Sequence, residues 1–112
     1  MSNRDEKLAS LITARAADFF NRQSDRTSMI TVIRTELRNK GRTAVIFITV
    51  WPVESELAAL SFAKRKRAGL KEFIGQTIKL KTTPHLDVEL DAGEKNRETI
   101  ERILRQDKNQ SE

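Results

Sequence analysis

Two stretches with the pattern of β-strands, separated by a short turn, constrain the fold more than any other feature of this chain. Residues 28–38 are rich in β-branched side chains and alternate at strand periodicity. Residues 43–51 are apolar almost throughout, which favours a central strand or one covered on both faces. Between them, Asn39, Lys40 and Gly41 form a turn in which Asn and Gly tolerate positive φ, so we expect a β-hairpin. An uninterrupted alternation in the first strand would place five residues on one face: Met29, Thr31, Ile33, Thr35 and Leu37.

Helical periodicity appears on both sides of the hairpin. A helix is predicted over about residues 4–22, and a second over about residues 53–67, after Pro52 ends the strand. Ala68-Gly69 should interrupt the second helix, and the helical pattern resumes from Leu70. We expect Trp51, at the end of its strand, to pack against a helix. The first helix carries an apolar stripe of Leu8, Leu11, Ile12, Ala16, Phe19 and Phe20.

A third strand is predicted after Pro84, because Leu86, Val88 and Leu90 alternate with polar residues. A short terminal helix follows over residues 94–106, and residues 107–112 are expected to be a flexible tail. The fold class is therefore α+β, with three strands in one sheet and the apolar helix faces packed on one side. We predict a single domain over residues 1–112, ordered over about 4–106.

Composition narrows the classes of function. The 112 residues include no Cys, which excludes disulfides and thiolate chemistry, and only 5% are aromatic, which argues against an RNA binder that stacks many bases. No apolar run is long enough to span a membrane, and the N-terminus has no apolar segment typical of a secretory signal. We therefore expect a cytoplasmic protein, without a membrane or small-molecule partner, and a monomer.

The positive charge of the chain is concentrated in one segment. Residues 64–81 hold seven basic side chains against the single acid Glu72, and they account for the whole net charge of +5. Such a segment suits phosphate binding, and a helix that restarts at Gly69 would offer free backbone N–H groups to an anion. The alternative is an ordinary solvated charged helix face. The predicted RNA-binding residues are Lys64, Arg65, Lys66, Arg67, Ala68, Gly69, Lys71, Lys79 and Lys81.

Four more basic residues lie in and around the hairpin turn. They could belong to the same RNA-binding footprint, or they could guard the edge of the sheet against pairing with another strand. These possible secondary contacts are Arg34, Arg38, Lys40 and Arg42.

No catalytic constellation is evident. His85 is the only histidine, and strand geometry places it on the same face as Asp87, yet no nucleophile or second base accompanies them. A surface histidine is the favoured interpretation, and we predict no catalytic residue, no metal and no cofactor. The acidic residues Asp87, Glu89, Asp91 and Glu94 are interpreted as an exposed strand face that balances the basic side.

The order of elements and two runs of sequence resemble the ribosome-binding factor A family of bacterial 30S assembly factors. The first run is the strand pair that contains Ile30-Thr31-Val32 and Ala44-Val45-Ile46-Phe47-Ile48-Thr49-Val50. The second is Leu70-Lys71-Glu72-Phe73-Ile74-Gly75, Ile78-Lys79-Leu80-Lys81 and Pro84-His85-Leu86. Together they cover about residues 4–104.

The resemblance implies a type II KH-like domain in which a helix kink replaces the usual glycine-rich loop. Counted back from Pro84, the kink falls at Lys66-Arg67-Ala68, where the family's Ala position is Lys and the Gly is displaced to Gly69. The turn residues Lys40-Gly41 also differ from the family's Asp-Leu pair. The chain therefore resembles a divergent member.

The resemblance further implies a ribosome assembly factor that binds the 16S rRNA of the immature 30S subunit and assists its maturation and rRNA processing, including at low temperature. The mechanism would be non-covalent RNA binding without catalysis. Two alternatives stay open from the residues alone: a general KH-like RNA-binding protein, and an adaptor that binds an acidic protein partner.

Overall fold

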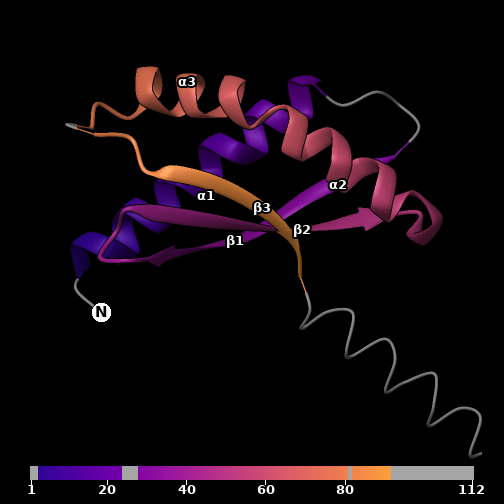
Figure 1. Ribbon diagram of the computed structural model, residues 1–112, viewed down its shortest axis with the longest axis horizontal. Coiled ribbons are helices and arrows are strands. Elements are labelled where there is room, and N and C mark those ends of the chain that lie inside the picture. Colours follow the sequence, from indigo (N-terminus) through magenta and orange to yellow (C-terminus); the bar gives the residue numbers. More distant parts are fainter. Residues whose placement is uncertain (1–2, 24–27, 81, 92–112) are drawn as a thin grey trace, which may run out of the picture.

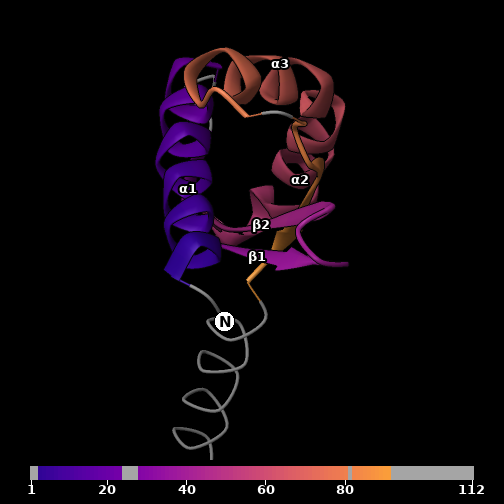
Figure 2. The same cartoon turned by 90° about the vertical axis from the view of Figure 1, so that its left-hand side faces the viewer.

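The computed structural model describes residues 3–23, 28–80 and 82–91, and in that part of the chain three helices cover one face of a three-stranded sheet (Figures 1 and 2). This arrangement confirms the predicted α+β class and the packing of the helices on one side. The predicted helix over 94–106 and the tail over 107–112 lie outside the described residues. The elements are α1 (Asn3–Gln23), β1 (Met29–Arg38), β2 (Thr43–Trp51), a 3-10 turn η1 (Val53–Ser55), α2 (Glu56–Arg65), α3 (Arg67–Thr77) and β3 (His85–Leu90).

The sheet has the order β1-β2-β3 and mixes two kinds of pairing. β1 and β2 form the predicted antiparallel hairpin, and its turn holds Asn39, Lys40 and Gly41 at φ angles of 54°, 57° and 82°. β3 runs parallel to β2, from Thr43 opposite His85 to Ile48 opposite Leu90. A parallel pair needs a crossover connection, which α2 and α3 supply.

A bulge in β1 overturns the predicted uninterrupted alternation. The register with β2 shifts between Val32 and Arg34, so the strand changes which parity of residue faces the helices. Before the bulge Ile30 and Val32 pack toward the core, and after it Thr35 and Leu37 do. The Oγ1 atom of buried Thr35 lies 2.8 Å from the Oγ1 atom of Thr13 on α1.

Of the two interpretations of residues 43–51, the central strand is confirmed, because β2 lies between β1 and β3. Ala44, Ile46 and Ile48 are fully buried in the core beneath the helices. On the opposite face, which we call the open face, Phe47 is only 6% exposed because the guanidinium of Arg34 lies 4.0 Å from the centre of its ring.

Two predicted core positions are wrong. The stripe of α1 does bury Ile12, Ala16, Phe19 and Phe20, but Leu11 is 48% exposed. Trp51 does not pack against a helix either, since it is 72% exposed. Within the described residues, no helix is long and apolar enough to cross a membrane.

Candidate nucleic-acid interface

The helix break lies in the middle of the basic segment, at a single residue. α2 ends at Arg65 and α3 begins at Arg67. Lys66 between them has φ −92° and ψ 5°, and its N–H donates to the carbonyl oxygens of Phe62 and Ala63, both at 3.1 Å. Its ammonium lies 5.7 Å from the centre of the Phe62 ring. The break therefore changes the helix direction within a run of four basic residues.

The position of the break corrects the prediction at Ala68-Gly69. Gly69 is the third residue of α3, and its backbone is helical rather than the start of a new helix. A Cβ atom at Gly69 would meet the Phe19 ring at 3.5 Å, which is ordinary contact. The backbone N–H groups at the start of α3 therefore belong to Arg67, Ala68 and Gly69.

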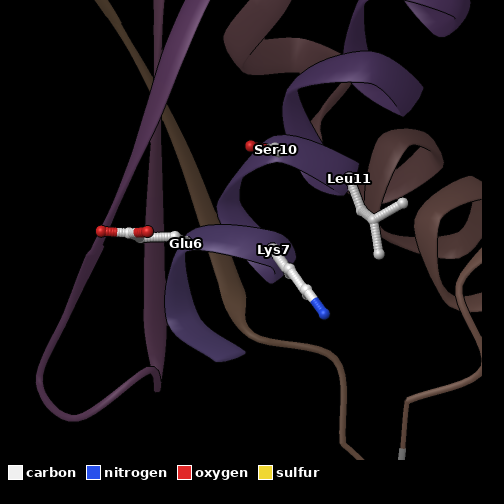
Figure 3. A pocket seen from close by; sticks show the side chains of 4 residues that line it. All are labelled: Glu6, Lys7, Ser10 and Leu11. Carbon is white, nitrogen blue, oxygen red and sulfur yellow. The ribbon is translucent and has the colours of Figure 1, made fainter. Parts of the chain in front are cut away.

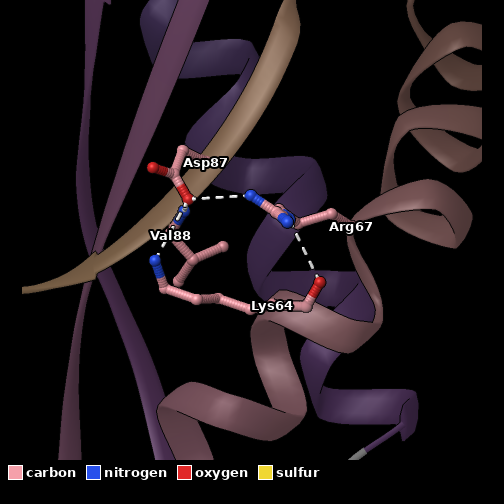
Figure 4. A network of polar contacts seen from close by, with 4 residues as sticks. All are labelled: Lys64, Arg67, Asp87 and Val88. Atoms are coloured by element: carbon pink, nitrogen blue, oxygen red, sulfur yellow. Dashed lines mark hydrogen bonds and ion pairs between the residues drawn. The ribbon is translucent and has the colours of Figure 1, made fainter.

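Asp87 on β3 joins the two sides of the break (Figure 4). One of its carboxylate oxygens lies 3.5 Å from the ammonium of Lys64 and 3.3 Å from the guanidinium of Arg67. The same oxygen accepts the backbone N–H of Val88 at 2.9 Å. Arg67 also donates its Nε–H to the carbonyl of Lys64 at 3.1 Å, which satisfies a terminal carbonyl of α2.

These contacts also protect an edge of the sheet. The N–H of His85 donates to the carbonyl of Arg42, and the N–H of Asp91 donates to the carbonyl of Ile48, so both point toward β2. Because backbone N–H groups alternate in direction along a strand, the N–H of Val88 points away from β2. β3 is an edge strand, and unpaired edge N–H groups can template pairing with another chain. Asp87 occupies one of them, with Lys64 and Arg67 beside it.

The surroundings of Asp87 favour its charged form. Partial burial raises the pKa of the Asp87 carboxyl, but the Val88 N–H and the charges of Lys64 and Arg67 outweigh burial. The net result is a pKa below the ordinary value of 3.8. The prediction of an exposed acidic strand face is wrong for the described residues, because Asp87, Glu89 and Asp91 are all half-buried. Asp87 and Asp91 are held in ion pairs, and Glu94 lies outside the described residues.

The remaining residues of the predicted site differ in exposure. Arg65, Lys71 and Lys79 are exposed, whereas Lys66 is half-buried. α3 runs from the break toward the end of the molecule that carries the hairpin turn (Figure 1). Ala68 is also exposed. Lys81 lies outside the described residues.

The four hairpin residues do not form one group. Arg34 lies within β1 opposite Phe47, and it pairs with Glu36 at 3.1 Å and with Asp91 at 3.9 Å. Arg38 pairs with Glu36 at 3.0 Å. Hydrogen bonding to Arg38 and Arg34 outweighs desolvation and lowers the pKa of Glu36 below 4.5. Lys40 and Arg42 lie at the turn itself and are exposed.

The described residues offer little for catalysis or metal binding. His85 is exposed, and none of the described His, Asp and Glu side chains gather in a group of three or more that could hold a metal ion. A hollow of about 510 Å³ lies against α1 and is lined by Glu6, Lys7, Ser10 and Leu11 (Figure 3).

The element order, the mixed sheet and the break between α2 and α3 define a KH-like α+β domain with a basic helical break. The family model for ribosome-binding factor A matches residues 4–104. The chain belongs to the ribosome-binding factor A family, as its sequence motifs indicated.

Solved structures of this family share the fold. The chain is similar to the crystal structure of ribosome-binding factor A from Thermus thermophilus, with a TM-score of 0.69 and 16% identity over 77% of this chain and 94% of that one. It is also similar to the solution structure of a Thermotoga maritima protein described as a putative ribosome-binding factor A, with a TM-score of 0.67 and 18% identity over 80% and 88% of the two chains.

A third similar structure is a Thermus thermophilus ribosome-binding factor A fitted into the cryo-EM map of a 30S complex. The TM-score is 0.59, with 17% identity over 80% of this chain and 93% of that one. No curated protein matches the chain at a significant level.

Proposed function

We propose that this protein is a ribosome assembly factor that binds the 16S rRNA of the immature 30S subunit and assists its maturation. The observation that carries the proposal is the family match over residues 4–104, which spans the hairpin, the helix break and β3 together. The fit of a Thermus thermophilus relative into a 30S complex supports the choice of subunit. The action would be non-covalent, without catalysis, and the protein a cytoplasmic monomer that also acts at low temperature.

The surface proposed to meet the RNA is the break and the exposed side of α3. Within the described residues, Arg65, Lys71 and Lys79 form no ion pair, so each can neutralise a phosphate. Lys64 and Arg67 contribute less, because Asp87 already neutralises part of their charge.

The contacts of Asp87 determine which substitutions test this surface. Reversing the charge of Lys64 or Arg67 would place acids against Asp87 and disturb the fold, so those residues are unsuitable. Arg65→Glu with Lys71→Glu changes only exposed positions. Arg4→Glu with Lys7→Glu on α1 is the matched control, because it alters the net charge equally at exposed positions elsewhere.

The experiment is a sucrose gradient of cell extract at low salt with tagged protein. The unmodified protein and the α1 control should migrate with free 30S particles rather than with 70S ribosomes, and the Arg65/Lys71 variant should shift toward the top. Unmodified protein that stays at the top would contradict the ribosomal role. A protein that crosslinks to other RNAs instead would be the general KH-like RNA binder, and nuclease-resistant capture of an acidic protein would indicate the adaptor.

A further inference from the structure

An apolar patch lies on the open face of the sheet, at the end away from the hairpin turn. Met29 is 66% exposed and stands directly opposite Trp51, which is 72% exposed. Ile33, in the bulge of β1, is 42% exposed. Alternation with the core residues Ile30 and Val50 turns these side chains away from the helices. We call Met29, Ile33 and Trp51 the Trp51 patch.

The chain leaves the described domain beside this patch. The N–H of Asp91 donates to the carbonyl of Ile48 at 2.9 Å, so β3 ends three residues before Trp51 along the neighbouring strand. The side chain of Asp91 lies on the open face, because it pairs with Arg34, whose guanidinium covers the Phe47 ring. β3 therefore ends at the same end of the sheet as the Trp51 patch, and the side chain of Asp91 lies on the same face as the patch.

We infer that residues 94–106 dock as an amphipathic helix on the Trp51 patch, with Ile100, Ile103 and Leu104 against Met29, Ile33 and Trp51. The three apolar residues recur at the spacing of one helix face, and the other residues of 94–106 are polar. An isolated helix of this length is marginal in water, so it needs a packing partner. The Trp51 patch is an exposed apolar surface at the end of the sheet where β3 stops.

The lengths are compatible. Trp51 lies roughly 10 Å beyond Ile48 along β2, at about 3.3 Å per residue. The nine steps from Asp91 to Ile100 span about 13 Å as helix and up to about 30 Å when extended. The segment therefore reaches the patch without tension.

The covalent link favours this occupant over a separate one. A segment joined by a short linker is present at an effective concentration on the order of millimolar. A second copy of the chain that buried the same contact area would have to be present at a comparable concentration to displace the linked segment from the patch.

The sole tryptophan reports on the docking directly, because the chain has one Trp and no Tyr. In the full-length protein, Trp51 should emit at shorter wavelength and be less accessible to acrylamide than in the variant Ile100→Ser, Ile103→Ser, Leu104→Ser. The matched control is Glu98→Ser, Arg102→Ser, Arg105→Ser, which alters the opposite face of the same helix and should leave the emission unchanged. The substituted residues follow the described domain, and circular dichroism checks that each variant is folded.

Identical emission and quenching in the full-length protein and the apolar variant would overturn the inference. Emission that changes when the protein is diluted would also overturn it, because it would assign the patch to a second copy. A shift confined to the apolar variant and independent of concentration supports docking within one chain.

Discussion

Asp87 connects three parts of the molecule through one carboxylate oxygen. It meets Lys64 at the end of α2, Arg67 at the start of α3 and the edge N–H of Val88. Because the acid comes from β3 and the bases from the helices, the network fixes the break against the sheet. Asp87 also neutralises part of the charge of Lys64 and Arg67, so it limits how much of the positive charge at the break is available to a partner.

Substitution of Asp87→Asn should lower the free energy of unfolding by about 1 kcal/mol at neutral pH, after allowance for solvent screening of the two partly exposed bases. The native pKa of Asp87 is depressed, so its contribution is present above the unfolded-state pKa of about 3.9. It is lost as the pH falls through the lower native pKa. Urea unfolding should therefore show a constant difference between pH 5 and 8 that narrows below about pH 4.

The control for this titration is Glu89→Gln, on the same strand two residues away. It should shift the urea midpoint less than Asp87→Asn at pH 7. Equal effects of the two substitutions would show that general acidity of the strand, rather than the network at the break, carries the contribution.

Two glycines should respond to alanine with opposite signs. Gly69→Ala should stabilise the protein by about 0.5–1 kcal/mol, because the position is helical and the new Cβ makes ordinary contact with Phe19. Gly41→Ala should destabilise it by about 1–2 kcal/mol, because Gly41 has a φ of 82°. Thermal unfolding of the two variants should show a higher Tm for Gly69→Ala and a lower Tm for Gly41→Ala than for the unmodified protein. A destabilising Gly69→Ala would mean that the helix breaks there after all.

At the scale of elements, α1 is held by a narrow stripe rather than by the whole of its apolar surface. Ile12 is fully buried between the helix and the sheet, whereas its neighbour Leu11 is 48% exposed beside the hollow on α1. The hydrophobic contribution of the helix is therefore concentrated in Ile12, Ala16 and the two phenylalanines.

Alanine substitutions at these two neighbours should separate burial from helix propensity. Ile12→Ala should cost about 3 kcal/mol, because it removes buried methyl groups and leaves a cavity. Leu11→Ala should cost less than about 1 kcal/mol. Denaturant unfolding compares the two, and similar losses would contradict the packing of α1.

The elements were largely predictable from the sequence, whereas their details depended on distant contacts. The hairpin turn and the central strand follow from local patterns, and the structure confirms both. The bulge at Ile33 did not follow, because an alternating pattern reads the same whether or not one residue is inserted into the ladder. Trp51 was misplaced because its burial depends on what covers the open face, and strand periodicity says nothing about that.

The candidate site was likewise predictable only in part from the sequence. Charge counting located the basic segment, and the helical pattern placed the break at Ala68-Gly69, where local propensity is weakest. The family resemblance placed the kink at Lys66-Arg67-Ala68, which includes the residue at which the helix breaks. The break lies at Lys66, between two residues held by an acid some twenty positions later in the chain. A contact of that range cannot be read from the residues near the break. Whether these residues bind RNA stays a prediction.

At the scale of the whole molecule, the basic break and the Trp51 patch are separate surfaces. The break carries exposed bases beside the edge of β3, and the patch exposes large apolar side chains on the open face. The first suits a polyanion and the second suits an apolar helix, so the two can be occupied at once.

RNA binding should depend steeply on salt. Four or so phosphate contacts predict a slope of about −3 to −4 for log K against log salt, measured by filter binding to 16S rRNA fragments. Arg65→Glu with Lys71→Glu should make the slope shallower by about 2, at roughly one unit per lost phosphate contact. The Arg4/Lys7 control should keep the original slope. A slope near zero for the unmodified protein would argue against a phosphate-binding surface.

The parallel pairing of β2 with β3 has a consequence for synthesis of the protein on the ribosome. The hairpin pairs residues that are close in sequence, whereas Thr43 pairs with His85, about forty residues later. β3 can therefore join the sheet only after that much more of the chain has been synthesised. Until then the emerging chain has the two helices without the carboxylate that fixes the angle between them. We therefore expect the break to reach its final shape only after β3 has left the exit tunnel, so a nascent chain, or one truncated before β3, should lack the folded basic break.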